Sequence, residues 1–279
     1  MQADTWRFQL NAEYRPRLYC VQYETDMHFL QRLCEEEGLH FHFQHSAEGH
    51  VLVFGDDQTS FSKPERSTAY RQASGMVAHA PVIDQFKLQL NTRPTHVSRR
   101  DYNFEKPRVQ LDSESENPLL PHLEDYAFPG QFIHRDRGQQ LTHQALERHR
   151  ADYQVANGRS DQSALRSGHF VEMTEHPCPE RNGLWLLTQV EHVGLQPQVL
   201  EEQTSDVTAQ DGFSQGYRNH FVATPWDVIF RPALEHPKPH MKGNQHAVVT
   251  GPPGEEIYCD QYGRVKVQLL WDRDGQQDR

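Results

Sequence analysis

Four histidines close together in the sequence are the residues best placed to bind a metal ion. His40 and His42 alternate along a predicted strand and share one side of it, and His45 and His50 flank the following turn. Two imidazoles at this spacing can share a metal ion. The run has no cysteine or carboxylate to complete a ligand set, so we place the histidines on the solvent face of a β-hairpin. The inward face then consists of Leu39, Phe41 and Phe43.

A second segment combines residue types that a thiol-based site uses, namely His176, Cys178 and Glu180. A nucleophilic cysteine needs a base that the fold brings within hydrogen-bonding distance. Pro177 and Pro179 flank this cysteine, and proline is typical of turns because it fixes φ and has no N–H. We therefore interpret the segment as a turn that connects two strands.

The sequence contains no complete catalytic motif. The patterns G-x-S-x-G, H-E-x-x-H and G-x-G-x-x-G and the P-loop are all absent from it. Three consecutive carboxylates, Glu35–Glu37, end a predicted helix, where negative charge opposes the helix dipole. A glycosidase would need two acids on opposite sides of a cleft, and nothing in the sequence locates such a pair. We predict that the chain is not an enzyme and has no cofactor-binding or metal site.

Composition argues against nucleic acids and membranes as partners. The 279 residues include 28 Lys and Arg and 39 Asp and Glu, a formal charge of −11 that repels phosphate backbones. No apolar run approaches the ~20 residues of a membrane-spanning helix, and the N-terminus lacks the pattern of a signal peptide. The four cysteines form no CxxC pair. We expect them to be reduced, structural thiols: Cys20, Cys34, Cys178 and Cys259.

Residues 18–55 predict a strand, a helix and a hairpin, which together form an α+β unit. Leu18–Tyr23 is the expected strand, and Thr25 is the expected N-cap of the helix. The helical stripe of apolar residues consists of Met27, Leu30, Leu33 and Cys34. Gly38 is typical of a helix end. The chain then forms the histidine-bearing hairpin and returns along His50–Phe54.

The middle of the chain predicts several strands and one further helix. The expected strands are Val82–Thr95, Arg99–Phe104, Leu165–Met173, Gly183–Gly194 and Asn219–Phe230. Asp136–Tyr153 is the expected helix, and its narrow apolar stripe predicts that its other side is solvated. We expect the charged segment Lys106–Pro121 to be a loop. His236–Lys242, which contains two prolines, is the expected linker.

The C-terminal stretch predicts three short strands and two tight turns. The expected strands are His246–Thr250, Glu255–Cys259 and Arg264–Trp271, joined as a meander. Asp260–Gly263 has the preferences of a type I turn, and Gly251–Gly254 contains two prolines and forms the other turn. In the last strand, Val265, Val267, Leu269 and Trp271 alternate onto one face. An isolated meander of this size is marginal in water, so we expect more strands to follow.

Several segments resemble, in the same order, the VgrG proteins of type VI secretion systems. They are Tyr14–Asp26, Phe29–Phe43, Asp101–Phe104, Tyr126–Gly130, Ser167–Phe170, His176–Pro177 and Phe230–Pro232. The most recognisable signature follows at 251–273. The residues that carry its motif and fold are Gly251, Gly254, Tyr258, Asp260, Tyr262, Gly263, Arg264, Val265, Val267 and Trp271. Departures at 243–247 and 268–270 leave the apolar alternation intact.

The resemblance implies an α+β fold that is mainly β, with barrel-like hub domains, small helical insertions and the start of an OB-fold. By this interpretation, residues 1–60 are an α+β hub unit and 61–235 are a barrel-like hub domain with one helix. Residues 236–279 are then a linker and the first strands of an OB-fold. The family's first hub barrel is expected before residue 1, and the rest of the OB-fold and the needle after residue 279.

The resemblance also implies a structural function. A homotrimeric spike caps the inner tube, contacts the baseplate and is driven into a target cell to deliver effectors. Effectors, adaptor proteins and a tip protein would attach through the needle. Such a protein is made in the cytoplasm without a signal peptide and is exported by the type VI apparatus. The alternatives are a spike-associated murein hydrolase whose catalytic part lies outside this chain, and an OB-fold binding module that uses Tyr258 and Tyr262.

Overall fold

The computed structural model describes residues 5–17, 20–47, 49–72, 80–196, 213, 215–255 and 258–272. The fold is α+β and mainly β, as the sequence predicts, with helices α1 (Asp26–Glu37) and α2 (Arg135–Ala151). The chain divides into two compact units. The first comprises Met1–Cys20 and Glu24–Pro237, and the second comprises Val21–Tyr23 and Lys238–Arg279. In the described part of the chain, no helix has the length and apolar character needed to cross a membrane.

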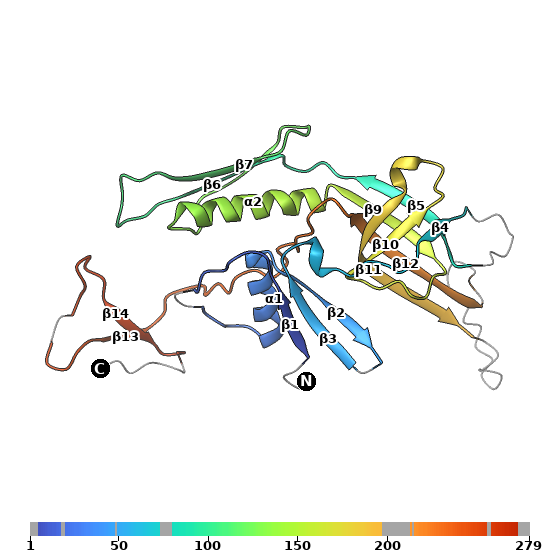
Figure 1. Ribbon diagram of the computed structural model, residues 1–279. Coiled ribbons are helices and arrows are strands. Elements are labelled where there is room, and N and C mark those ends of the chain that lie inside the picture. The colour runs from blue at the N-terminus through green and yellow to red at the C-terminus, as the bar shows by residue number, and fades with distance from the viewer. Residues whose placement is uncertain are drawn as a thin grey trace. The chain divides into compact units, whose positions relative to one another are not determined.

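A closed β-barrel is the largest element of the first unit (Figure 1). Its strands follow the order β10-β11-β12-β9-β5-β4. In chain order they are β4 (Thr68–Tyr70), β5 (Val82–Leu90), β9 (Gln154–Ser160), β10 (His169–Thr174), β11 (Gly183–Leu195) and β12 (Gly216–Pro225). The short β4 runs parallel to both β5 and β10 and closes the barrel between them. The other neighbouring strands are antiparallel.

Apolar side chains fill the barrel, and most of them alternate inward along its strands. They are Ile83, Phe86, Ala156, Leu165, Val171, Met173, Trp185, Leu187, Phe221 and Ala223. This alternation is why β5, β10, β11 and β12 were expected, although their ends are shifted by several residues. The sequence analysis did not predict β9, because Asn157, Gly158 and Arg159 interrupt its apolar pattern.

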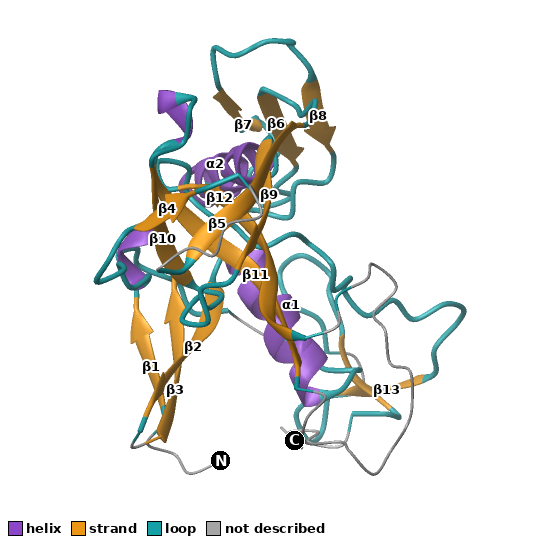
Figure 2. Ribbon diagram, turned by 90° about the vertical axis from the view of Figure 1, so that its right-hand side faces the viewer, coloured by secondary structure: helices purple, strands orange, loops and turns teal. Residues whose placement is uncertain are grey.

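A second sheet packs against α2 (Figure 2). It consists of β6 (His96–Asp101), β7 (Leu111–Glu116) and β8 (Glu124–Ala127), in the order β7-β6-β8. Val97, in the central strand, packs with Ala145 and Leu146 of the helix. The helix therefore covers one face of this sheet with a small apolar contact.

Two predictions for this region are wrong. The segment 106–121 is not all loop, because it contains β7. The side of α2 that was expected to be solvated contributes buried polar residues, Gln144 and Glu147. This side forms a polar contact layer with other segments of the unit, in which Gln144 Nε2 donates to the Glu37 carbonyl at 2.9 Å and Glu147 accepts from Arg231 at 2.7 Å. Polar residues in such a layer give no apolar periodicity that a sequence pattern can detect.

The N-terminal sheet unit consists of β1 (Trp6–Gln9), α1, β2 (His40–Ser46) and β3 (Gly49–Gly55). Its strand order is β1-β3-β2, with β1 parallel to β3 and β2 antiparallel to β3. The ends of α1 are as predicted, since Thr25 Oγ1 accepts from the His28 N–H and Gly38 takes a φ of 70°. The strand expected at Leu18–Tyr23 is absent from 20–23, and Leu18 and Tyr19 lie outside the described residues.

The second unit contains a two-stranded antiparallel sheet, β13 (Ala247–Thr250) and β14 (Lys266–Leu269). The meander predicted here is wrong in its order, because β13 pairs directly with β14. No strand occurs at Glu255, Tyr258 or Cys259, and residues 256–257 lie outside the described part. Several apolar residues in and beside this sheet are exposed, namely Val248, Val249, Val265 and Val267.

We expect the substitution Gly158→Ala to destabilise the barrel. A Cβ added to Gly158 would lie 2.0 Å from the ring of Phe221, which fills the barrel interior. Overpacking of this kind costs about 1–3 kcal/mol of unfolding free energy, which urea denaturation followed by circular dichroism would measure. Gly194→Ala in β11 is the matched control, because its Cβ would meet no atom within 4 Å. Equal stability of the two variants would contradict the packing.

Candidate functional site

The four histidines do not form one cluster. His40 and His42 share one side of β2, as predicted, but only 4% and 6% of their surface is exposed. His45 and His50 pair across the hairpin with their Nδ1 atoms 2.7 Å apart. Among the described residues, no group of three or more His, Cys, Asp or Glu side chains could hold a metal ion.

The hairpin buries the face opposite to the one predicted. The residues expected inward are exposed or only partly buried: Leu39, Phe41 and Phe43. His40 stacks on Phe61, with ring centroids 4.2 Å apart, and His42 lies 5.2 Å from the same ring. By polarity alone, the histidines belong on the solvent face and the leucine and phenylalanines on the inward face. An imidazole that stays neutral can instead pack in the core as an aromatic ring does.

Burial keeps both of these imidazoles neutral. Burial lowers the pKa of His40 from its ordinary value of 6.5 to about 4, and it lowers the pKa of His42 to about 4, with a further contribution from His40. His40 Nε2 donates to the carbonyl of Asp57 at 3.2 Å. The Nδ1 atoms of both histidines are buried without a hydrogen-bond partner. The hairpin therefore depends on these rings remaining uncharged.

A cavity of about 560 Å³ lies between β2 and the barrel. Beside the two buried histidines, it is lined by Phe61, Phe230 and the β11 residues Leu186 and Leu187. Its outer part includes Arg166, which is exposed and donates to the His45 carbonyl at 3.4 Å. We refer to this space as the histidine cavity.

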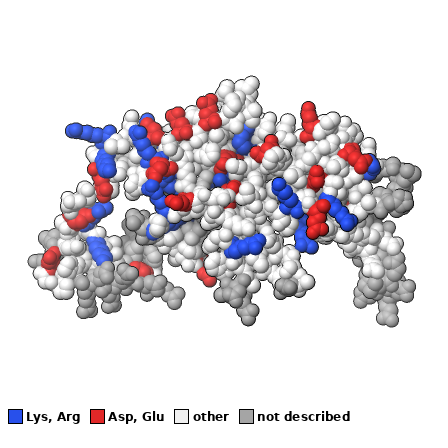
Figure 3. Space-filling view, viewed as in Figure 1, with Lys and Arg blue, Asp and Glu red and all other residues white. Residues whose placement is uncertain are grey.

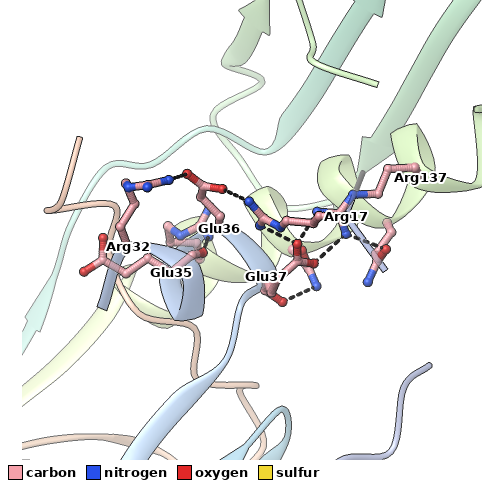
Figure 4. Close-up of polar contacts among 9 residues, drawn as sticks. Arg17, Arg32, Glu35, Glu36, Glu37 and Arg137 are labelled. Atoms are coloured by element: carbon pink, nitrogen blue, oxygen red, sulfur yellow. Dashed lines mark hydrogen bonds and ion pairs between the residues drawn. The ribbon is translucent and has the colours of Figure 1, made fainter. Parts of the chain in front are cut away.

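Arginines from separate segments hold the consecutive carboxylates at the end of α1 (Figure 4). Arg17 bonds to Glu36 at 2.6 Å and to Glu37 at 2.5 Å. Arg137 of α2 bonds to Glu37 at 2.7 Å. Arg32, one turn earlier in α1, bonds to Glu36 at 2.9 Å. These cations offset the repulsion between neighbouring carboxylates and the unfavourable helix dipole.

Glu35, the first of the three carboxylates, fixes the chain near the end of the first unit. Its Oε2 accepts from the backbone N–H groups of Glu235 and His236, at 3.0 and 2.9 Å. Its Oε1 lies 2.6 Å from His236 Nδ1. A buried carboxylate with several donors is well satisfied, so Glu35 attaches this late segment to α1.

Arg231 connects three further parts of the first unit. Its Nε donates to Glu147 of α2 at 2.7 Å, and both side chains are about 10% exposed. Its Nη1 donates to the carbonyls of Gly38 and Asp56, at 2.8 and 2.6 Å. Arg148 extends these contacts by donating to the Glu35 carbonyl at 3.2 Å. We call this set the polar junction: Arg17, Arg32, Glu35–Glu37, Arg137, Glu147, Arg148, Arg231 and His236.

The sequence analysis missed most of the polar junction. Glu35–Glu37 are unfavourable at a helix end, but their positions do not indicate which cations compensate them. Arg137 and Arg231 come from segments about 100 and 200 residues away, and no sequence spacing links them to α1. The unfavourable acidic run was the available signal. It indicated that basic partners must exist, without indicating which ones.

The segment around Cys178 forms a turn, as predicted, and includes a short 3-10 helix, η2 (Pro179–Arg181). His176 Nδ1 accepts from the backbone N–H of Cys178 at 2.9 Å, so this nitrogen organises the turn. Asn182 bonds to the His176 backbone on both sides, at 2.8 and 3.1 Å. Elsewhere, burial raises the pKa of the Cys34 thiol to about 11, so it stays protonated.

The motif residues of the second unit organise its two turns. Asp260 accepts from the N–H groups of Tyr262 and Arg264, each at 2.9 Å, and its carbonyl accepts from Gly263 at 3.0 Å. Gly263 takes a φ of 76°, which favours glycine. In the other turn Gly254 takes a φ of 91°. Both turns predicted from the sequence are present.

Comparison with known protein families and curated proteins shows similarity to tail-hub and spike proteins. A model of the phage tail baseplate hub (GPD) family matches residues 2–198. Two Pseudomonas aeruginosa proteins named type VI secretion system spike proteins, VgrG4b and VgrG5, are 60% and 59% identical over 99% of this chain. The chain spans only 35% and 36% of their lengths, about a third of each relative.

A solved structure has a similar fold. It is described as the E. coli c3393 protein, a component of the type VI secretion system with structural similarity to the T4 tail proteins gp27 and gp5. It matches with a TM-score of 0.62 and 22% identity, over 98% of this chain and 57% of that chain. At this identity the likeness concerns the fold.

Loss of the Arg231 guanidinium is expected to be strongly destabilising. Arg231→Met leaves Glu147 without this buried partner and removes the donor to two carbonyls. Breaking a buried pair in this way costs about 3–5 kcal/mol. Arg100→Met removes an exposed pair with Asp112 and should leave the urea midpoint nearly unchanged. A similar midpoint for both variants would contradict the role of the junction.

We expect stability to fall as the pH drops from 6.5 towards 4. The unfolded chain binds protons at His40 and His42 below pH 6.5, whereas the folded chain binds them only near pH 4. The loss is on the order of 2 kcal/mol for each histidine. Urea midpoints across this range measure it. His42→Leu should reduce the slope, and Phe43→Leu on the opposite face should not. A pH-independent midpoint would contradict the burial of neutral imidazoles.

Proposed function

Because the chain belongs to the phage tail baseplate hub family, we propose that it is the hub part of a type VI secretion spike of the VgrG kind. In this role it is a structural component that assembles as a homotrimer and caps the inner tube. The spike is driven into a target cell and delivers effectors. The observation that carries the proposal is the identity of 60% and 59% to two VgrG spike proteins over 99% of the chain.

The use of the polar side chains supports a structural rather than a catalytic role for this part of the protein. Glu35, Glu36 and Glu37 each bond to donors from other segments. Such contacts hold elements together, and they occupy the carboxylates that acid–base chemistry would need free. The proposal therefore assigns no catalytic or cofactor-binding residue to this chain.

We assign residues 1–60 to an α+β hub unit, 61–235 to a barrel-like hub domain and 236–279 to the start of an OB-fold. The signature residues at 251–271 are proposed to form the turns and first strands of that fold. The hydrogen bonds that Asp260 makes within its turn support a folding role for this residue.

The proposed partners are the inner-tube protein, the baseplate and, through parts outside this chain, effectors, adaptors and a tip protein. Nucleic acid is not among them, because the formal charge is −11 and the face in Figure 3 mixes acidic and basic side chains. We propose that the protein is made in the cytoplasm without a signal peptide and leaves the cell through the type VI apparatus.

Deletion of the gene tests this function. In a strain that lacks any related spike genes, deletion is expected to abolish secretion of the inner-tube protein, because the tube cannot assemble without its cap. Immunoblots of culture supernatants measure the secreted protein, and a complementing copy of the gene should restore it. A protein exported by a signal peptide is the control and should be unaffected. Normal secretion of the inner-tube protein in the deletion strain would contradict the proposal.

A further inference from the structure

The histidine cavity is electrostatically unlike the rest of the molecule. The chain has 39 acidic and 28 basic residues, yet the described residues that line this cavity include no Asp or Glu. Its polar lining consists of Arg166, four histidines and two hydroxyl residues: His40, His42, His45, His192, Ser167 and Thr188. A cavity with a cation and no anion favours a negatively charged group.

The cavity follows the free edge of a strand. In the sheet order β1-β3-β2, β2 lies at the edge. The lining includes residues 40–43 and 45, which alternate between the two faces of β2, so the cavity lies along this edge and not over one face. Arg166–Gly168 and β11 form the other wall. An edge strand presents unpaired N–H and C=O groups that can pair with an extended chain.

The interior of the cavity has mainly aromatic and apolar surface. Phe61, Phe230 and Leu186 line it beside the rings of His40 and His42. A volume of about 560 Å³ lies within the range of ligand pockets and can accept an aromatic side chain.

We propose that the histidine cavity binds an extended acidic peptide segment of a partner protein, which pairs with the edge of β2. An aromatic side chain of the segment occupies the cavity, and its carboxylates meet Arg166 at the rim. The guanidinium of Arg166 has several N–H groups and uses one for the His45 carbonyl at 3.4 Å, so donors remain for a carboxylate. This binding site does not depend on the role of the chain in a spike.

Two end-blocked peptides of opposite charge test the proposal: Asp-Phe-Asp-Phe-Asp and Lys-Phe-Lys-Phe-Lys. The whole 279-residue chain, labelled with ¹⁵N, is titrated with each peptide and its amide shifts are recorded by NMR. The acidic peptide is expected to bind saturably and to shift amides of 40–45, 166–168 and 186–190. The net charge of −11 favours the lysine peptide everywhere else, so a preference for the acidic peptide reports the local site.

Two variants locate the charge that selects the peptide. Arg166→Gln should weaken binding of the acidic peptide about fivefold, as expected for an exposed ion pair. Arg100→Gln, on the exposed surface of β6, is the control and should bind as the unaltered chain does.

Several results would overturn the proposal. They are equal binding of both peptides, no saturable binding of either peptide, and shifts confined to amides outside the cavity. Concentration-dependent shifts of the cavity amides without peptide would also overturn it, because they would assign the cavity to a second copy of the chain. Normal secretion of the inner-tube protein in the deletion strain would contradict the proposed function and leave this peptide result unchanged, so the two proposals fail independently.

Discussion

The architecture of the first unit depends on compensating the negative charge at the C-terminal end of α1. Three adjacent carboxylates there oppose the helix dipole and repel one another, so they are tolerated only with cations and N–H donors close by. Arg17, Arg137 and the backbone of residues 235–236 supply these donors from three separate segments. Satisfying the carboxylates therefore joins the N-terminal sheet unit, α2 and the late segment of the unit. Arg231 likewise donates to the carbonyl groups of Gly38 and Asp56, which joins two further segments.

Elements with a regular apolar periodicity were predicted from the sequence, and elements without one were not. The barrel strands β5, β10, β11 and β12 and the capped helix α1 were expected because apolar spacing and capping residues are local signals. The strands β7 and β9 carry serine or glycine at buried positions, namely Ser113, Gly158 and Ser160, so their patterns are not apolar. The buried face of β2 was assigned wrongly, because His40 and His42 pack as neutral aromatic rings on Phe61.

The candidate sites were harder to predict than the fold, since both are made by contacts between distant segments. The polar junction brings together residues from positions 17 to 236, and the histidine cavity combines β2 with β11 and Arg166. Neither leaves a short motif in the sequence. The polar groups of the junction connect elements of the first unit, and those of the histidine cavity line a space between elements. This use fits a structural hub better than a catalytic centre.

Hydrogen–deuterium exchange of the Arg231→Met variant, read by mass spectrometry under native conditions, tests most directly whether the polar junction holds the first unit together. We expect faster exchange in α1 and in residues 230–237, since these segments lose their shared donor. A smaller loss of protection is expected in the barrel strands β5 and β12, which pack around their own apolar core. Unchanged exchange in α1, or an equal loss of protection in the barrel, would contradict this role of the polar junction.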